Sequence, residues 1–400
     1  MKSRLPQGVA VLLVLFSALS PAVTAVAEPQ SEFDGWSWGP QLPERRTAFG
    51  CSATKDSIIT VGGTFWTESD SGMPQKRWLR RVDRLKLGSD NWETLPDYPV
   101  LIDYALVVSL EGRVYAIGGQ NNDGLLADTN WIAPDETPAR WRQGPRLPRP
   151  MSRLRGGTWG NVIVALTDEY STSDSDQSAS GPSVIVWDTN EPNGQWAEVA
   201  AAPDPTIGFR AAAVAGERLF LFGGASASGN EQLRLSDKVW RYCLQRDEWR
   251  PCSPLPLAMR DATAVKIDER YIAIAGGVEE AVAATSTADR QPRIVLSTQC
   301  LIYDSMDDKF HRAEPLRLAI ADHGMAVLGD RLLVVGGEDS PYRTRTDLVQ
   351  SYEVRSLIKR AKRHCEPAGD DASFNNPPVV GPPAFADLQR KRGGLRNAEE

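Results

Sequence analysis

The residues LFLFGG (Leu219–Gly224) and, further on, WRPCSPLP (Trp249–Pro256) decide the fold of this chain. The first stretch is an apolar run of strand length that ends in a glycine pair, and it recurs as IITVGG (58–63), YAIGG (115–119), IAIAGG (272–277) and LLVVGG (332–337). The second places a proline seven positions after an aromatic residue, and it recurs as Trp36–Pro43, Trp92–Pro99, Trp141–Pro148 and Trp196–Pro203. A degenerate sixth copy has Phe310 and Arg317 in place of the tryptophan and the proline. Successive aromatic residues of this series lie 49 to 61 residues apart. The chain is therefore built from repeats of roughly 50 residues with one internal order.

This repeat predicts an all-β fold, a six-bladed kelch-type β-propeller over residues 32–356. Repeats of this length, in which an apolar strand ends in glycines and an aromatic residue recurs at a regular spacing, are typical of propeller blades. Each repeat reads as four short strands, of which the glycine pair ends the second and the aromatic residue marks the fourth. The third repeat keeps its strand at 162–166 but has no glycine pair. A single four-stranded sheet cannot bury both faces, so the repeats are expected to stack in a ring.

The order of the motifs predicts how the ring closes. The chain opens with a fourth-strand motif, Trp36–Pro43, while the last glycine pair is followed only by a third strand near residues 348–354. The N-terminal strand should therefore complete the final blade and leave no free sheet edge. Beyond the propeller, residues 355–364 are expected to form a short basic helix. Residues 366–400, rich in proline, glycine and charge, are expected to be a disordered tail.

Residues 1–27 have the features of a secretory signal peptide. Lys2 and Arg4 give a positive start, Val9–Leu19 is a short apolar run, and Ala25–Ala27 is a small-residue cleavage site. The apolar run falls short of the roughly 20 residues that a membrane span needs. The mature chain is therefore expected to be exported to the periplasm or the extracellular space, without a membrane span.

Charge and cysteine content limit the possible partners. Removing Lys2 and Arg4 from the 45 basic residues leaves 43 against 52 acidic ones, a net charge of −9, which disfavours nucleic acid and anionic membranes. Cys243 and Cys252 flank one predicted hairpin and can form a disulfide in an oxidising compartment; buried free thiols are the alternative. His311 and His323 do not cluster with metal ligands, and no nucleotide or nucleophile motif is present. We therefore expect no metal and no cofactor.

Two sets of side chains are predicted to converge at one mouth of the propeller. One set opens the innermost strands and the other follows the glycine pairs, where the connections 64–79, 167–183 and 278–294 are long. The candidate binding residues are Arg46, Arg153, Arg155, Arg210, Arg260, Asp261, His323 and Trp66, which stands outside the repeat register. An arginine-lined funnel suits a carboxylate on a small ligand. The alternative is that these arginines pair with neighbouring acids and stiffen the ring.

With its export signal, six blades and N-terminal closure, the chain resembles the bacterial kelch-propeller family of N-acetylneuraminate epimerases. Arg260-Asp261-Ala262-Thr263 and Gly337-Glu338 followed by Arg345-Thr346-Asp347 carry the closer resemblance, although the second spacing is one residue longer than in that family. The resemblance implies that Glu338 is the catalytic acid/base and that Arg345, the second catalytic candidate, contacts the substrate. It implies interconversion of the anomers of a small acidic sugar by proton transfer. The alternative is a non-enzymatic propeller that binds a protein or glycan in the cell envelope.

Overall fold

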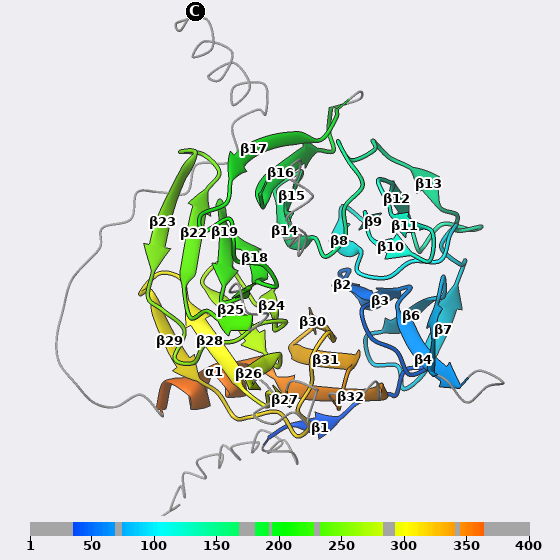
Figure 1. Ribbon diagram of the computed structural model, residues 1–400. Helices are drawn as coiled ribbons and strands as arrows, with labels where there is room; N and C mark the ends of the chain where they lie inside the picture. The colour runs from blue at the N-terminus through cyan, green and yellow to red at the C-terminus, as the bar shows by residue number, and fades with distance from the viewer. Residues whose placement is uncertain are drawn as a thin grey trace, which may run out of the picture. The chain divides into compact units, whose positions relative to one another are not determined.

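Six antiparallel sheets, each of four strands, stand around a common axis in the described part of the computed structural model (Figure 1). The structure describes residues 35–68, 74–167, 181–191, 194–227, 233–282, 293–340 and 345–363. The six-bladed, all-β prediction is confirmed. The predicted signal peptide (1–27) and tail (366–400) lie outside the described residues and stay predictions.

Each blade runs from an innermost strand at the axis to an outermost strand at the rim. Blade 1 consists of β2 (Gly50–Ala53), β3 (Ser57–Val61), β6 (Val82–Lys86) and β7 (Trp92–Leu95). Blade 2 consists of β8 (Leu106–Leu110), β9 (Arg113–Ile117), β12 (Thr129–Ile132) and β13 (Arg142–Gln143). Blade 3 consists of β14 (Arg155–Trp159), β15 (Val162–Leu166), β16 (Ser183–Asp188) and β17 (Ala197–Ala201). Blade 4 consists of β18 (Ala211–Ala215), β19 (Arg218–Phe222), β22 (Val239–Cys243) and β23 (Glu248–Cys252). Blade 5 consists of β24 (Thr263–Lys266), β25 (Tyr271–Ala275), β28 (Cys300–Asp304) and β29 (Lys309–Arg312). Blade 6 consists of β30 (Gly324–Leu328), β31 (Arg331–Gly337), β32 (Thr346–Glu353) and β1 (Ser37–Trp38).

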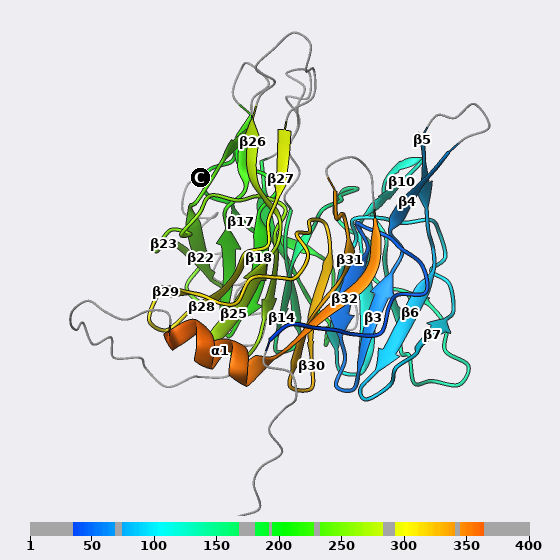
Figure 2. The ribbon, with the colours of Figure 1, turned by 90° about the horizontal axis from the view of Figure 1, so that it is seen from below.

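Short hairpins form within the connections between the second and third strands. They are β4 (Thr64–Glu68) with β5 (Pro74–Trp78), β10 (Gln120–Asn121) with β11 (Gly124–Leu125), β20 (Ala225–Ala227) with β21 (Leu233–Leu235), and β26 (Val278–Val282) with β27 (Arg293–Leu296). Figure 2 shows β4–β5 and β26–β27 rising from one face of the ring, with the helix α1 (Val354–Arg363) towards the other. Residues 168–180, in the corresponding connection of blade 3, lie outside the described residues. The hairpin-bearing face is the one predicted to carry the mouth.

The N-terminal strand closes the ring, as predicted. Ser37 of β1 lies opposite Ser351 of β32, and the two strands run antiparallel. The backbone N–H of Leu42 donates to the carbonyl oxygen of Asp347 at 2.8 Å. The Arg331 guanidinium adds a hydrogen bond to the Ser37 hydroxyl at 2.9 Å. The last blade is thus assembled from both ends of the propeller chain.

The repeated tryptophans link five of the six blades to the blade before each of them. Their indole N–H groups donate to backbone carbonyls of the preceding blade, in the pairs Trp36–Glu314, Trp92–Pro40, Trp141–Pro96, Trp196–Pro145 and Trp249–Ala201, at 2.9 to 3.2 Å. The aromatic residue of each repeat lies on the outermost strand or next to it. The tryptophan of the seven-residue motif therefore marks the outermost strand and also forms a hydrogen bond between neighbouring blades.

The glycine pairs let neighbouring blades approach closely. In blade 1, Gly62 has a φ of +66°, and a Cβ added there would lie 2.2 Å from the carbonyl oxygen of Ile102 in blade 2. The N–H of Gly63 donates to the same oxygen at 2.8 Å. A side chain at Gly62 would collide with the backbone of the next blade, so glycine is required there.

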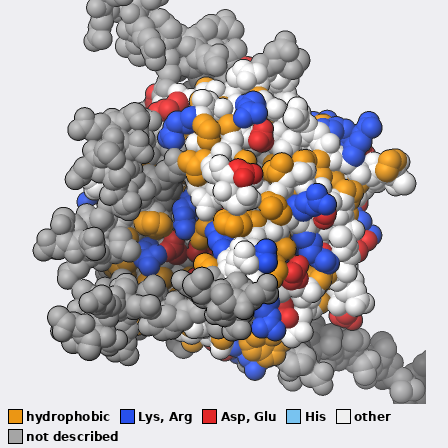
Figure 3. Space-filling model, turned by 45° about the vertical axis from the view of Figure 1, so that its right-hand side comes forward, with side chains coloured by type: hydrophobic (Ala, Val, Ile, Leu, Met, Phe, Trp, Pro, Cys, Tyr) orange, Lys and Arg blue, Asp and Glu red, His pale blue; other side chains and the backbone are white. Residues whose placement is uncertain are grey.

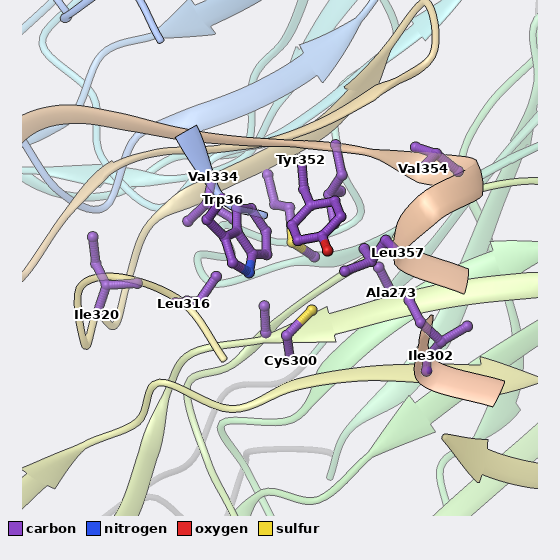
Figure 4. Close-up of a cluster of buried hydrophobic side chains, with 14 residues drawn as sticks. Trp36, Ala273, Cys300, Ile302, Leu316, Ile320, Val334, Tyr352, Val354 and Leu357 are labelled. Carbon is purple, nitrogen blue, oxygen red and sulfur yellow. The ribbon is translucent and has the colours of Figure 1, made fainter. Parts of the chain in front are cut away.

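The helix α1 begins one residue earlier than predicted and covers the boundary of blades 5 and 6. Val354, Leu357 and Ala361 are buried in a cluster with residues of both blades (Figure 4). In that cluster the Trp36 and Tyr352 rings meet edge to face, with centroids 5.3 Å apart. Among the residues that the structure describes, no helix has both the length and the apolar composition needed to cross a membrane.

The possible disulfide between Cys243 and Cys252 is not formed. The register of β22 and β23 pairs Cys243 with Glu248 and Cys252 with Val239, which places the two thiols at opposite ends of the hairpin. The alternative, free thiols, is the outcome. Burial raises the pKa of the Cys51 and Cys300 thiols to about 12, so both stay protonated at neutral pH.

Candidate functional site

A ring of six residues surrounds the axis at the start of the innermost strands. One residue of each blade adopts a left-handed backbone conformation, with φ between +46° and +59°: Ala48, Tyr104, Arg153, Phe209, Asp261 and Asp322. Backbone N–H groups of this mouth ring donate to the ring residue of the preceding blade, from Tyr104 to Ala48 at 2.7 Å and from Arg153 to Tyr104 at 3.0 Å. A left-handed conformation costs about 1–2 kcal/mol for a residue with a Cβ. Because one residue of every blade has this conformation, the backbone strain is a general feature of this propeller and does not single out a catalytic residue.

The side chains of the mouth ring meet across the axis. The Arg153 guanidinium lies 3.7 Å from the centre of the Tyr104 ring and 5.3 Å from that of Phe209. Its Nη1 is 3.7 Å from Oδ1 of Asp261 and 4.0 Å from Oδ1 of Asp322. The Tyr104 hydroxyl donates to Oδ2 of Asp322 at 2.9 Å. Residues from blades 2 to 6 therefore form one cluster of charged and aromatic groups.

Burial governs the electrostatics of this cluster. It raises the pKa of the Asp261 carboxyl, and the charge of Asp322 raises it further, against the opposing effect of Arg260 and Arg153. Burial also raises the pKa of Tyr104 well above its usual value, so that its hydroxyl keeps its proton and donates to Asp322. Burial disfavours the charged form of Arg153 and by itself would lower its pKa. The contacts with Tyr104, Asp322 and Asp261 favour the charged form more strongly, so the pKa of Arg153 is raised. The guanidinium is thus a permanent cation held between two acids.

A small pocket opens beside the mouth ring, between blades 5 and 6. Its volume is about 120 Å³, and it is lined by Arg153, Phe209, Arg260, Asp261, Val278, Leu296, Ala321, Asp322 and Glu338. The backbone of Glu338 pairs with that of Ala321 in an isolated bridge. Nη1 of Arg345 donates to Oε1 of Glu338 at 2.9 Å. The structure brings together the Glu338 and Arg345 singled out in the sequence and places the Glu338 side chain in this mouth pocket.

A larger cavity, the central channel, lies along the innermost strands of all six blades. Its volume is about 430 Å³, and Asp322 lines both this channel and the mouth pocket. Arg155 and His323 line the channel and not the mouth pocket. Burial lowers the pKa of His323 to about 4, and the charge of Arg155 contributes. His323 is therefore a neutral side chain at neutral pH.

Two of the predicted binding arginines lie in the interior of the propeller. Arg46 is fully buried, and its guanidinium donates to Asp83 at 2.6 Å and to Thr60 at 2.7 Å. Arg46 occupies the position two residues before the mouth ring that other blades fill with Ile102, Met151, Ile207, Met259 and Ile320. Arg210 is 3% exposed and donates to the carbonyl oxygens of Pro203 and Asp204. These contacts are those of the structural alternative, in which arginines stiffen the ring.

The other predicted residues divide between the mouth and its surroundings. Arg153, Arg260 and Asp261 line the mouth pocket. Trp66 lies on β4, opposite Lys76 of β5.

Sequence reasoning missed Lys76 and Phe209. The ammonium group of Lys76 reaches from β5 to Asp103 at 2.7 Å and lies 5.9 Å from the centre of the Tyr104 ring. A hairpin loop gives no repeat signal that predicts this contact. Phe209 occupies the same position in blade 4 that Asp322 occupies in blade 6, directly before Arg210 and His323 respectively. An alignment of all six repeats would therefore have identified Phe209.

Opposite charges are paired throughout the mouth. Arg260 contacts Asp261, Arg345 contacts Glu338, and Lys76 contacts Asp103. Positive and negative side chains are likewise interspersed over the outer face shown in Figure 3. The mouth is therefore rich in charged groups without a large excess of either sign.

Comparison with known proteins supports the fold. The family description "Kelch motif" matches residues 208–256, which span blade 4. Beta-scruin of Limulus polyphemus is 24% identical over 58% of this chain and 24% of its own length, and kelch-like protein 38 of Rattus norvegicus is 23% identical over 72% and 43%. The chain thus spans less than half the length of these relatives. A solved structure titled "Structure of YjhT" superposes with a TM-score of 0.59 over 78% of this chain and 95% of that chain, at 15% identity. At this identity the likeness concerns the fold alone, and this chain is a six-bladed β-propeller of the kelch type.

Proposed function

We propose that this protein binds a small sugar in the mouth pocket and interconverts its anomers by proton transfer, with Glu338 as the acid/base group. The observation that carries the proposal is that Glu338 lines the same pocket as Arg153 and Arg260, while its carboxylate accepts a hydrogen bond from Arg345. Residues 1–27 suggest that the protein acts after export. The sequence predicts that this sugar is acidic.

Interconversion of anomers needs few catalytic groups. As the anomeric hydroxyl of a cyclic hemiacetal loses its proton, its oxygen becomes a carbonyl oxygen, the bond between the anomeric carbon and the ring oxygen breaks, and the ring oxygen takes up a proton. The open-chain carbonyl group then rotates, and the freed hydroxyl attacks its other face with the two proton transfers reversed, which closes the ring as the other anomer. Glu338, oriented by Arg345, would accept the first proton, and Arg260 would stabilise the charge on the ring oxygen. Arg345 acts here as a positioning residue, since the pocket lining contains Glu338 and not Arg345.

The size of the pocket suits part of a single sugar ring. Its volume of about 120 Å³ compares with an engineered cavity of about 150 Å³ that binds benzene. The pocket is therefore somewhat smaller than one that encloses a six-membered ring, and a sugar would enter it in part, with the rest of its ring and substituents in the open mouth. Phe209, Val278, Leu296 and Ala321 provide apolar surface for the C–H face of the ring.

Proton NMR of anomer equilibration tests this function. Pure anomers of a panel of neutral and acidic sugars would be dissolved with the wild type, with Glu338→Gln and with Glu248→Gln, an exposed control on β23. We expect the wild type and the control to accelerate at least one sugar equally, and Glu338→Gln to be slower by about 100-fold or more, as for the loss of a general base. Equal rates for Glu338→Gln would exclude its role, and no acceleration of any sugar would exclude the reaction.

The alternative function is a non-enzymatic propeller that binds a protein or glycan in the cell envelope. It is favoured by the pairing of charges in the mouth, because such pairs stiffen the ring without any ligand. The hairpins β4–β5 and β26–β27 around the mouth would then form the binding surface. The two functions differ in footprint: Arg260→Ala should abolish binding of a small sugar, whereas a large partner should be lost only when several hairpins are changed together.

A further inference from the structure

Two of the residues that line the mouth pocket each have a buried carboxylate oxygen without a hydrogen-bond partner. Within the described residues, Oδ1 of Asp261 and Oδ1 of Asp322 lack one, although the second oxygen of Asp261 contacts Arg260 and that of Asp322 accepts from Tyr104. The Asp261 residue is 8% exposed, and both side chains line the mouth pocket. A buried acceptor without a partner is unfavourable by about 1–3 kcal/mol, more for a charged group. Two residues that line one small pocket therefore each have an oxygen that no protein group satisfies.

The Arg153 guanidinium lies near both oxygens but forms a hydrogen bond with neither. Its Nη1 is 3.7 Å from one and 4.0 Å from the other, longer than a hydrogen bond. A group that contacts both the guanidinium and a carboxylate from the side, such as a water or a ligand hydroxyl, would satisfy both. A hydroxyl suits this role because it accepts from a guanidinium and donates to a carboxylate at the same time. Two carboxylates around one guanidinium offer places for two neighbouring hydroxyls.

The charges of the pocket disfavour a carboxylate as the recognised group. Arg153, Arg260 and Arg345 carry three positive charges, and Asp261, Asp322 and Glu338 carry three negative ones when ionised. Each of these arginines is already within 4 Å of one of the acids. A ligand carboxylate would have to displace a buried acid from its cation, whereas hydroxyls complete contacts that are now open.

We infer that the mouth pocket recognises a neutral sugar through two hydroxyls on adjacent carbons, held between Arg153 and the open oxygens of Asp261 and Asp322. The inference rests on the proposed function only in taking the mouth pocket as the ligand site, and it holds whether or not the bound sugar reacts. It differs from the acidic sugar expected from the sequence, because Arg153, Arg260 and Arg345 each have an acidic partner within 4 Å.

Calorimetric titration tests the inference. The probes are glucose, galactose and mannose, their 2-deoxy and 3-deoxy analogues, glucuronate and N-acetylneuraminate, and the proteins are the wild type, Asp322→Asn, Asp261→Asn and the exposed control Asp307→Asn. We expect at least one neutral sugar to bind, and a deoxy analogue lacking one of the two hydroxyls to bind at least about tenfold more weakly. Asp322→Asn and Asp261→Asn should each weaken binding at least about tenfold, and Asp307→Asn should not. Thermal melting of each variant confirms that it is folded.

The outcomes separate this inference from the proposed reaction. Binding of the acidic sugars alone, or neutral-sugar binding that both mouth variants leave unchanged, would overturn the inference. A neutral sugar that binds as expected but equilibrates no faster in the NMR assay would overturn the reaction and leave the inference standing. If no sugar binds, both are wrong.

Discussion

The indole N–H of Trp92 donates to the carbonyl oxygen of Pro40 at 3.0 Å and so joins blade 1 to blade 6. Tryptophans make the same bond at four other blade boundaries. At the boundary of blades 4 and 5 the equivalent residue is Phe310, whose side chain has no N–H group to donate. At the rim, an indole-to-carbonyl hydrogen bond therefore joins neighbouring blades at five boundaries, and a phenylalanine takes the place of the tryptophan at the sixth.

Replacing Trp92 by Phe should weaken the ring. The change removes the bond to Pro40 and keeps an aromatic ring, so the free energy of unfolding should fall by about 1 kcal/mol or somewhat more. Urea denaturation measures this change. Trp38→Phe, at a residue 45% exposed, is the control and should stay within about 0.5 kcal/mol of the wild type. Equal stabilities of the two variants would contradict a role for the indole bond.

Replacing Phe310 by Trp should have the opposite effect. In blade 4, Ser253 follows Trp249 by four residues, as Pro40 follows Trp36 and Pro96 follows Trp92. An indole at position 310 should therefore reach the Ser253 carbonyl and raise the free energy of unfolding by about 1 kcal/mol. The same denaturation experiment checks it, and a less stable variant would show that blades 4 and 5 lack the space that other boundaries have.

Removing residues 28–43 should open the ring. This deletion takes away β1 and two buried side chains, Trp36 and Leu42, and truncation of a buried tryptophan alone costs about 3–5 kcal/mol. We expect a large fall in melting temperature or loss of the folded state, measured by circular dichroism. A deletion of equal length at the C-terminus, residues 385–400, is the control and should have little effect. A truncated protein with the melting temperature of the wild type would contradict closure by the N-terminal strand.

His323 should make stability depend on pH. Burial lowers its pKa to about 4, so between pH 6.5 and 4 the unfolded chain binds a proton that the folded protein does not. Its contribution to stability is therefore present above pH 6.5 and lost as the pH falls, by up to about 3 kcal/mol at pH 4. His323→Leu, chosen because Leu154 occupies the same position in blade 3, should flatten this dependence in urea denaturation from pH 4.5 to 7.5. An unchanged slope would show that His323 is not the group that titrates.

The sequence predicted the ring because each repeat carries its own local signals. The glycine pair marks a close approach between blades, and the aromatic residue marks a bond between them, so both follow from nearest-neighbour contacts. The closure also followed from motif order, since a fourth strand at one end needs a third strand at the other. The left-handed residue before each innermost strand escaped notice because non-glycine residues fill all six places.

The mouth was harder to predict because its contacts join distant blades. Arg153 meets Tyr104 of blade 2 and Asp322 of blade 6, and no local pattern records either pairing. Arginines were singled out by residue type, yet Arg46 and Arg210 point into the blades while Arg153 points to the axis. The difference lies in the backbone, because only Arg153 of these three is a mouth-ring residue with positive φ.

A crystal structure with a bound neutral monosaccharide tests the central claim most directly. Crystals would be soaked with the tightest-binding sugar of the panel, with Asp322→Asn crystals soaked in parallel. We predict one sugar ring in the mouth pocket of the wild type, with two adjacent hydroxyls between Arg153, Asp261 and Asp322 and the anomeric carbon towards Glu338, and an empty pocket in the variant. A sugar bound elsewhere on the propeller, or equally in both crystals, would contradict the account.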